Sequence, residues 1–199
     1  MTHVLAVPPR QGRTIFLKPI QVDDYALIQA AEMHPLIAQQ WRFRGHTPSP
    51  EAWANALWSG VFAQFLVVER QTSNRLGLVM AYRHDAQNGL AHVGATSFSP
   101  DTKSPGVMLG LFMFFEYLFW TWPLRKLYFE VPEYNVSQFG SAIGRLVEIE
   151  GRFREHSFFG GKYWDEFILS LTRSKWDRIG PRLLSVEGVL ARKSGGGRE

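Results

Sequence analysis

LAHVGATSFSPDTKSPGVMLGLFMFFEYLFWTWPLRKLYFEV, residues 90–131, decides the fold of this chain. Its first part, 90–100, is largely apolar and is predicted to be a strand. Ser104 as N-cap and Pro105 as first helical residue then predict the start of a helix. The helix is expected to end near Thr121, and the segment KLYFEV follows it directly as a strand. A strand, a helix and another strand in this order predict a β-α-β crossover, so the two strands should lie parallel in one sheet.

The segments before this unit predict strands and helices in alternation. TIFLKPI, residues 14–20, ends at a proline and suits a first strand. AQFLVVER (63–70) and RLGLVMAYRHD (75–85) complete a three-stranded meander with 90–100, and Asn88-Gly89 is its strongest turn signal. Between the first strand and this meander, helices are expected after Asp23 or Asp24 and after Ser49.

The segments after this unit predict a weaker helix at 135–151, a hairpin at 154–173 and a last helix at 178–193. The fold class that follows is α+β, with a mixed, mostly antiparallel sheet flanked by helices and a β-α-β crossover. The length of 199 residues suits one domain, expected at 1–176, with a C-terminal helix and flexible basic tail at 177–199.

Composition excludes several kinds of site. The chain has no cysteine, so it has no disulfide, no thiolate nucleophile and no Cys-ligated metal. Its six histidines are scattered without the spacing of a metal site, and we expect no metal. The net charge of +4 favours acidic partners but decides little by itself. We do not expect nucleic acid, because no basic patch with interleaved aromatic residues occurs beyond WRFRG, residues 41–45.

The same reading predicts a soluble, cytoplasmic protein that needs no membrane. The first residues do not have the pattern of a signal peptide. The most apolar stretch, LGLFMFFEYLFW (109–120), contains Glu116 and is too short to cross a bilayer.

Four segments together resemble the GNAT superfamily of N-acetyltransferases, and within it the branch of bacterial ribosomal-protein N-terminal acetyltransferases. They are LKPIQVDDY (17–25), LGLVMAYRHDAQNGLAHVG (76–94), YLFWTWPLRKLYFEVPEYN (117–135) and EGRFREHSFFGGKYWDEFILSLTR (150–173). The resemblance covers about residues 14–176. It implies a sheet splayed between its fourth and fifth strands, with acetyl-CoA or another acyl-CoA in the gap.

In that family the pantetheine arm lies along the fourth strand and the pyrophosphate lies at the start of the following helix. The family's loop has Arg or Gln, two residues, Gly, one residue, and Gly or Ala; here it is degenerate in either alignment, which assigns Gly106 and Met108 or Pro105 and Val107 to its two small positions. A capped helix start without a ligand is the alternative. The resemblance implies these cofactor-binding residues: Phe98, Ser99, Lys103, Ser104, Gly106, Val107, Met108 and Asn135.

The candidate catalytic residues are Glu130, His92, Ser141 and Tyr134. Glu130 would take a proton from the acceptor amine, since only the neutral amine attacks, and His92 is a second candidate base because it titrates near neutral pH. The family's acidic tyrosine is replaced by Ala142, so Ser141 or Tyr134 would reprotonate the leaving thiolate. Ordinary structural or surface roles for Glu130 and His92 stay open.

The resemblance implies that the acceptor pocket lies at WRFRG and the helix after Ser49, where relatives build theirs. Trp41, Phe43, Trp53 and Trp58 would line an apolar cleft, and Arg42 and Arg44 would bind an acidic group. Core aromatic residues with exposed arginines are the alternative reading.

The predicted activity is transfer of an acetyl or other small acyl group from acyl-CoA to a primary amine by direct attack in a ternary complex. Two alternatives stay open: an acyl donor carried by an acyl carrier protein or otherwise activated, and a non-catalytic binding module. The expected partners are an amine-bearing small molecule or a protein N-terminus. A second copy of the chain, in a homodimer, also stays open.

Overall fold

The computed structural model describes residues 10–99 and 104–188. The elements, in chain order, are β1 (Ile15–Pro19), η1 (Val22–Asp24), α1 (Tyr25–Glu32), α2 (Pro35–Ala38), α3 (Pro50–Trp58), β2 (Val61–Glu69), β3 (Arg75–Asp85), β4 (Leu90–Ser97), α4 (Pro105–Thr121), β5 (Lys126–Pro132), α5 (Glu133–Val136), η2 (Gly140–Ala142), β6 (Glu148–Phe159), β7 (Lys162–Thr172) and α6 (Arg173–Ser185).

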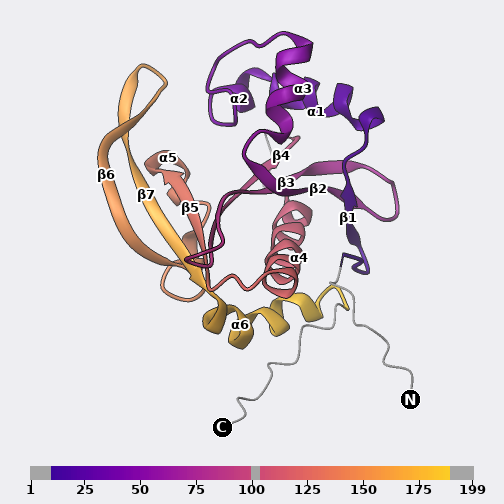
Figure 1. Ribbon diagram of the computed structural model, residues 1–199, viewed down its shortest axis with the longest axis vertical. Coiled ribbons are helices and arrows are strands. Elements are labelled where there is room, and N and C mark those ends of the chain that lie inside the picture. The colour runs from indigo at the N-terminus through magenta and orange to yellow at the C-terminus, as the bar shows by residue number, and fades with distance from the viewer. Residues whose placement is uncertain (1–9, 100–103, 189–199) are drawn as a thin grey trace.

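All seven strands form one sheet in the order β1-β2-β3-β4-β5-β7-β6. The β4–β5 pair is parallel and every other pair is antiparallel. Helices α1–α3 lie over one face of β2–β4, whereas α4 and α6 lie on the opposite side (Figure 1). The predicted α+β class, with its mixed sheet and its β-α-β crossover, is therefore confirmed.

Helix α4 is the centre of the larger core because apolar residues surround it. Met113, Phe114, Leu118 and other α4 residues pack against the inward faces of the strands and against Trp176 of α6. The one acidic residue within this apolar helix, Glu116, is buried and accepts a hydrogen bond of 2.7 Å from the Trp176 indole. A buried carboxylate needs such a partner, so this bond couples α6 to α4.

A second, smaller hydrophobic core lies on the other face of the sheet. This second core joins α1 and α3 to the sheet through Ile28, Trp53, Leu57 and residues of β2 and β3. The predicted domain boundary at residue 176 falls inside α6, and α6 contributes both Trp176 and Leu184 to the larger core.

The prediction of a weak helix at 135–151 is wrong. The chain forms only the short α5 and one 3-10 turn, η2, and then enters β6 at Glu148. Gly144 has a φ of +78°, in the left-handed region, so a continuous α-helix cannot pass through it. The segment from Glu148 instead pairs with β7, so long-range strand pairing overrides the local helical pattern.

The last helix begins earlier than predicted, at Arg173. Thr172 is its N-cap, and its hydroxyl accepts a hydrogen bond of 3.3 Å from the Lys175 amide. The end of the predicted helix, 189–193, lies outside the described residues.

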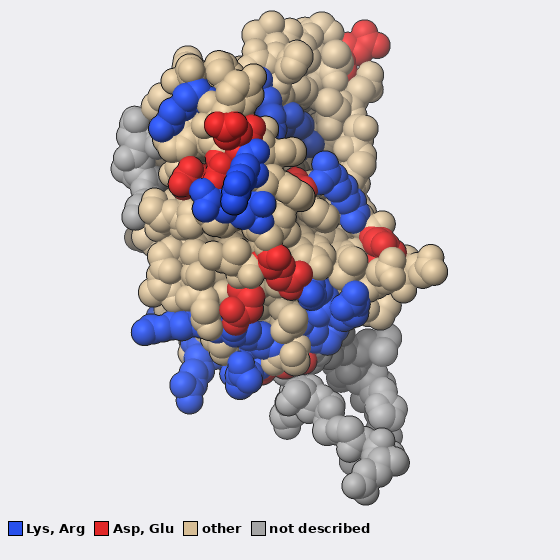
Figure 2. Space-filling model, turned by 90° about the vertical axis from the view of Figure 1, so that its left-hand side faces the viewer, with Lys and Arg blue, Asp and Glu red and all other residues tan. Residues whose placement is uncertain are grey.

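Charges on the face that contains β6 and β7 are mixed, with basic and acidic side chains interspersed (Figure 2). Arg152 pairs with Asp165, and Lys126 pairs with Glu150 at 2.7 Å. This face is therefore not a uniformly basic surface. Within the described ranges, no helix combines the length and apolar character needed to cross a membrane.

Candidate active site

The parallel pairing of β4 and β5 ends early, and this opens the sheet. The two strands pair only from Leu90–Lys126 to His92–Tyr128. Beyond that point β4 pairs with β3 alone and β5 pairs with β7 alone, and the strands diverge (Figure 1). The facing edges carry backbone N–H and C=O groups without a strand partner, which an extended amide-bearing chain can satisfy. The predicted splay between the fourth and fifth strands is thus present.

Glu130 and His92 meet where the strands begin to diverge. The His92 Nδ1 atom lies 3.4 Å from Glu130 Oε1, but no hydrogen bond joins them. This nitrogen is buried and has no hydrogen-bond partner among the described residues. A buried polar atom without a partner is rare in folded proteins, and here it lies beside a carboxylate at the base of an open gap. The sequence-predicted pair is therefore brought together.

Three residues that sequence reasoning missed surround this pair. Tyr82 is the β3 partner of His92, and its hydroxyl donates to Glu130 Oε2 at 3.4 Å. Arg83 donates to Glu130 Oε1 at 2.5 Å. Tyr128, on β5, packs against His92 with ring centroids 5.6 Å apart. Glu130 is thus held by two donors, one from each of two neighbouring positions on β3.

Burial and charge set the protonation of this cluster. Burial lowers the pKa of His92 below its usual value of 6.5; Glu130 raises it in part, and Arg83 lowers it further. Burial raises the pKa of Tyr82 to about 12, with a contribution from Glu130. His92 is therefore neutral near pH 7 and able to accept a proton, while Tyr82 stays a protonated donor.

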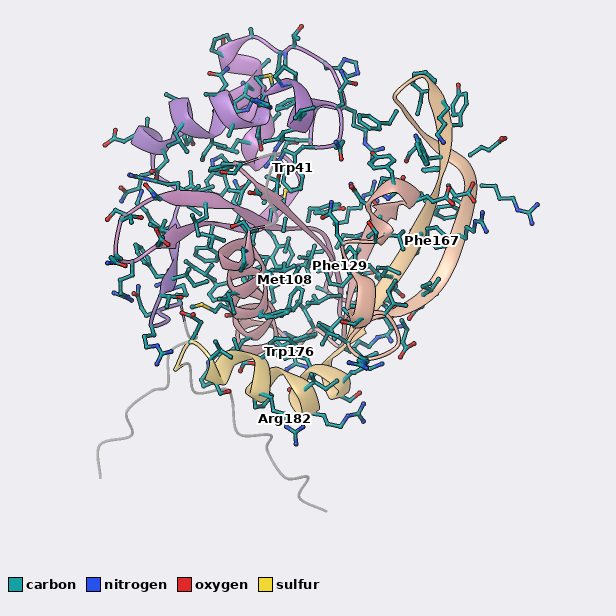
Figure 3. The ribbon with its side chains drawn as sticks, turned by 180° about the vertical axis from the view of Figure 1, so that it is seen from behind. Trp41, Met108, Phe129, Phe167, Trp176 and Arg182 are labelled. Atoms are coloured by element: carbon teal, nitrogen blue, oxygen red, sulfur yellow. The ribbon has the colours of Figure 1, made fainter. Side chains whose placement is uncertain are left out.

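Trp41 lies on the α1–α3 side of the sheet, where it is seen in Figure 3, and packs against the second core. Its indole donates to the buried Glu32 at 2.7 Å, which fixes the ring. At Gly94 of β4, an added Cβ would lie only 3.2 Å from the Trp41 ring. Glycine at this position therefore lets the ring lie directly over the strand.

The other predicted acceptor residues are further from this pair. The indole of Trp53 and the guanidinium of Arg42 both donate to Glu32, at 2.8 and 3.2 Å, and Trp53 is buried in the second core. Arg42 also donates to the Leu57 carbonyl. Phe43 packs against the second core, and the exposed Trp58 donates to Tyr25. Trp41 is thus the aromatic residue that the structure brings to the gap, and Arg42 is occupied by structural partners.

The helix start predicted as the phosphate site is present at α4. The Ser104 hydroxyl accepts from the Val107 amide at 3.4 Å, and Met108 is exposed on the first turn. Figure 3 shows Met108 on α4, across the sheet from Trp41. An added Cβ at Gly106 would lie 2.4 Å from the terminal Cδ1 of Leu76, a contact that rotation of this flexible side chain could relieve. Lys103 lies outside the described residues.

The segment between β4 and α4 has two further candidates. The Phe98 amide donates to Leu76 at 2.9 Å, and its ring packs against the second core. Ser99 is exposed, and its amide donates to the Ser97 hydroxyl. Both residues lie just before the start of α4.

The remaining candidates lie past the end of β5. Asn135 donates to Gln40 at 3.3 Å and so connects α5 to the segment after α2, across the gap. Tyr134 contacts Phe159 and Trp164, and burial raises its pKa. Ser141 is exposed on η2, and no contact joins it to Glu130 or His92 within the described chain.

Two solved structures that are similar to this chain are N-acetyltransferases. A GCN5-related N-acetyltransferase from Brucella melitensis has a TM-score of 0.65 and 21% identity, over 92% of this chain and 86% of that one. Spermidine N-acetyltransferase from Vibrio cholerae, in complex with CoA and spermine, has a TM-score of 0.70 and 19% identity, over 82% and 98%.

No protein-family model matches the chain, and no curated protein matches its sequence. At the identities of these structures the likeness is one of fold. The fold of this chain is that of the GNAT N-acetyltransferases.

Proposed function

We propose that the protein is an N-acyltransferase that moves an acetyl or other small acyl group from acyl-CoA to a primary amine. The observation that carries this proposal is the gap between β4 and β5, with the buried, unpartnered Nδ1 of His92 at its base beside Glu130. The solved structures of the same fold support it, since one of them holds CoA and a polyamine.

The described residues fit an acyl-CoA donor. The free edge of β4, from Val93 to Ser97, suits the two amides of a pantetheine arm, and the start of α4 suits its phosphates. When bound there, the donor supplies a thioester carbonyl to the gap. Asn135, at the far wall, has an amide group that would contact the same arm.

The residues of the gap then act on protons. Glu130 or the neutral His92 accepts the proton of the amine, whose nitrogen forms the new C–N bond as the C–S bond breaks. The sulfur leaves as a thiolate and takes a proton from Tyr134, whose raised pKa keeps the phenol protonated. Ser141 is the weaker candidate for this step because it is exposed. Placing the amine beside the carbonyl supplies much of the rate.

The experiment has two parts. Calorimetric titration with acetyl-CoA and with desulfo-CoA at two salt concentrations is expected to show binding that weakens as salt rises. Thiol release with a panel of amines is then compared for the wild type and the Glu130→Gln, His92→Ala double variant, which we expect to lose at least about 100-fold in kcat. Glu51→Gln, an exposed carboxylate on α3, is the matched control. Full turnover by the double variant would remove Glu130 and His92 from the mechanism.

The finer assignment, to the ribosomal-protein acetyltransferase branch, rests on the pattern from Glu150 to Asp165. Asp165 binds both Arg152 and the amide of Glu155, so the pattern closes a bulge between β6 and β7. The contacts of Asp165 hold the β6–β7 hairpin together. The pattern therefore supports assignment to a branch of the family but does not identify the acceptor substrate.

A donor on a carrier protein is the second candidate. One feature of the α4 start favours it: Pro105 has no N–H to offer a phosphate. This feature weakens the case for a phosphate cradle. Equal rates with acetyl-CoA and with an acetyl carrier protein would count against this candidate.

A further inference from the structure

Arg44 is an exposed arginine that forms no ion pair with any residue of 10–99 or 104–188. It lies in the turn after α2, which is closed by hydrogen bonds from the Arg44 amide to Trp41 and from the Gly45 amide to Ala38, at 3.1 and 2.9 Å. The φ of Arg44 is +47°, in the left-handed region that residues other than glycine seldom adopt.

The charge of Arg44 acts on both walls of the gap. It lowers the pKa values of Tyr82 on β3 and of Tyr134 on α5, against the burial that raises both. Tyr82 in turn lies 3.4 Å from Glu130. The hydrogen bond between Gln40 and Asn135 joins the same segment to the same far wall. The turn that carries Arg44 is bonded to Trp41, which lies over Gly94 of β4, and its neighbour Gln40 is bonded to Asn135, so this turn lies at the opening of the gap.

The carboxylate to which an ammonium group would bind, that of Glu130, is already paired with Arg83. Arg83 donates to Glu130, and it too has a φ of +47°, within the bulge of β3 between Tyr82 and Asp85. An acceptor with several ammonium groups would meet two guanidinium groups here. Glu130 is already paired with Arg83, and Glu166 is buried and bound by Ser157, while a third carboxylate of this wall, Glu133, is exposed on α5. Like charges at such a site disfavour a polycation.

We infer that the acceptor is a small amine that carries an acidic group, a carboxylate or a phosphate, near its nitrogen, and that Arg44 binds this group. The inference rests on the proposed N-acyl transfer and specifies its substrate class. Arg44 binds the acid, the amine lies between Glu130 and His92, and Trp41 packs against the body of the acceptor. Polyamines, which the Vibrio cholerae enzyme binds, are poor acceptors of this protein.

Two matched pairs of acceptors test the inference. L-Phenylalanine is compared with L-phenylalaninamide, and O-phosphoethanolamine with ethanolamine; spermidine is the polycation. Each is assayed for kcat/KM with acetyl-CoA in the wild type and in Arg44→Gln. Taking the ratio between the two proteins for each acceptor cancels the different basicities of the amines. The control is Arg178→Gln, an exposed arginine on α6, at the other end of the molecule from the α2–α3 segment (Figure 1).

Arg44→Gln is expected to lower kcat/KM at least about tenfold for one acidic acceptor, chiefly by raising KM. For its neutral partner the loss should be less than about twofold, because only the acidic acceptor loses a charge-assisted contact with Arg44. The larger loss identifies carboxylate or phosphate as the group bound. Equal losses within both pairs would overturn the inference, as would a wild-type preference for spermidine or for the neutral amines.

A binding measurement separates this inference from the proposed function. Acetyl-CoA that fails to bind would defeat both. If acetyl-CoA binds but no acceptor reacts, the acceptors are titrated into the complex with desulfo-CoA. Tighter binding of an acidic acceptor than of its neutral partner, lost in Arg44→Gln, supports the inference; no such difference overturns it and leaves the acyl-transfer proposal standing.

Discussion

His92 combines burial with a nearby carboxylate and a nearby guanidinium, and these act on its proton in opposite directions. Burial disfavours the imidazolium, Glu130 favours it, and Arg83 disfavours it; the net effect is a lowered pKa. The position of His92 opposite Tyr82 could not be counted from the Asn88-Gly89 turn. A two-residue turn would pair His92 with Asp85, whereas the longer loop and the bulge at Arg83 pair it with Tyr82.

The pKa of His92 is predicted to shift in a stated direction in the wild type and in two variants. In the wild type its NMR midpoint is expected below 6.5. Glu130→Gln should lower the midpoint further because the favourable charge is removed, and Arg83→Gln should raise it because the unfavourable charge is removed. The His92 signal is identified by its loss in His92→Gln. A midpoint that does not move in either variant would show that these charges do not act on the imidazole.

Helix α4 depends on a glycine for its contact with the sheet. An added Cβ at Gly110 would lie 2.4 Å from one methyl group of Val67 and 3.1 Å from its Cβ, and both residues are in the core. A β-branched side chain on a strand cannot turn away. Gly110 therefore reflects the close approach of α4 to β2, a requirement that a motif search for phosphate loops would misread.

Gly110→Ala is expected to lower the free energy of unfolding by about 1–3 kcal/mol, because the new methyl group overpacks the interface between α4 and β2. The measurement is urea unfolding. Gly151→Ala is the matched control: its nearest neighbour, Ile168, lies 3.9 Å from the added Cβ, so a change within about 0.5 kcal/mol is expected. An equal effect of the two substitutions would contradict the packing explanation.

For the molecule as a whole, Glu187 fastens the segment after α6 to the first strand. Its carboxylate accepts hydrogen bonds from the Thr14 hydroxyl at 2.5 Å, from the Thr14 amide at 2.8 Å and from the Ile15 amide at 3.2 Å. Burial alone raises the pKa of Glu187, but these bonds outweigh it, and the pKa is lowered from 4.5. The two ends of the described chain are thereby joined.

Because the pKa of Glu187 is lower in the folded than in the unfolded state, its carboxylate adds stability above pH 4.5, and this stability is lost as pH falls through the folded value. Glu187→Gln is expected to lower the free energy of unfolding by about 1–3 kcal/mol at pH 7. In urea unfolding at pH 7 and at pH 3.5, the difference from the wild type should shrink at the lower pH. Glu51→Gln should show no such pH-dependent loss.

Local signals in the sequence predicted most of the elements. Ser49 and Ser104 are the predicted caps of α3 and α4, and the alternating segments form β2, β3 and β4 as expected. Spacing and capping depend on near neighbours, so the sequence alone carries them. The segment 135–151 could not be read this way, since its second half is a strand only because β7 is available to pair with it.

The sequence by itself also supplied Glu130, His92 and Trp41 as candidates. The resemblance to the GNAT superfamily implied Glu130 and the region of Trp41, and strand position with side-chain chemistry indicated His92. Only the tertiary structure decided which arginines belong to the gap. Arg42 is held by Glu32 and by the end of α3, while Arg83, from a bulge in β3, reaches Glu130. Partners of this kind are far apart in the chain, and the sheet register that joins them is set by a bulge and by packing.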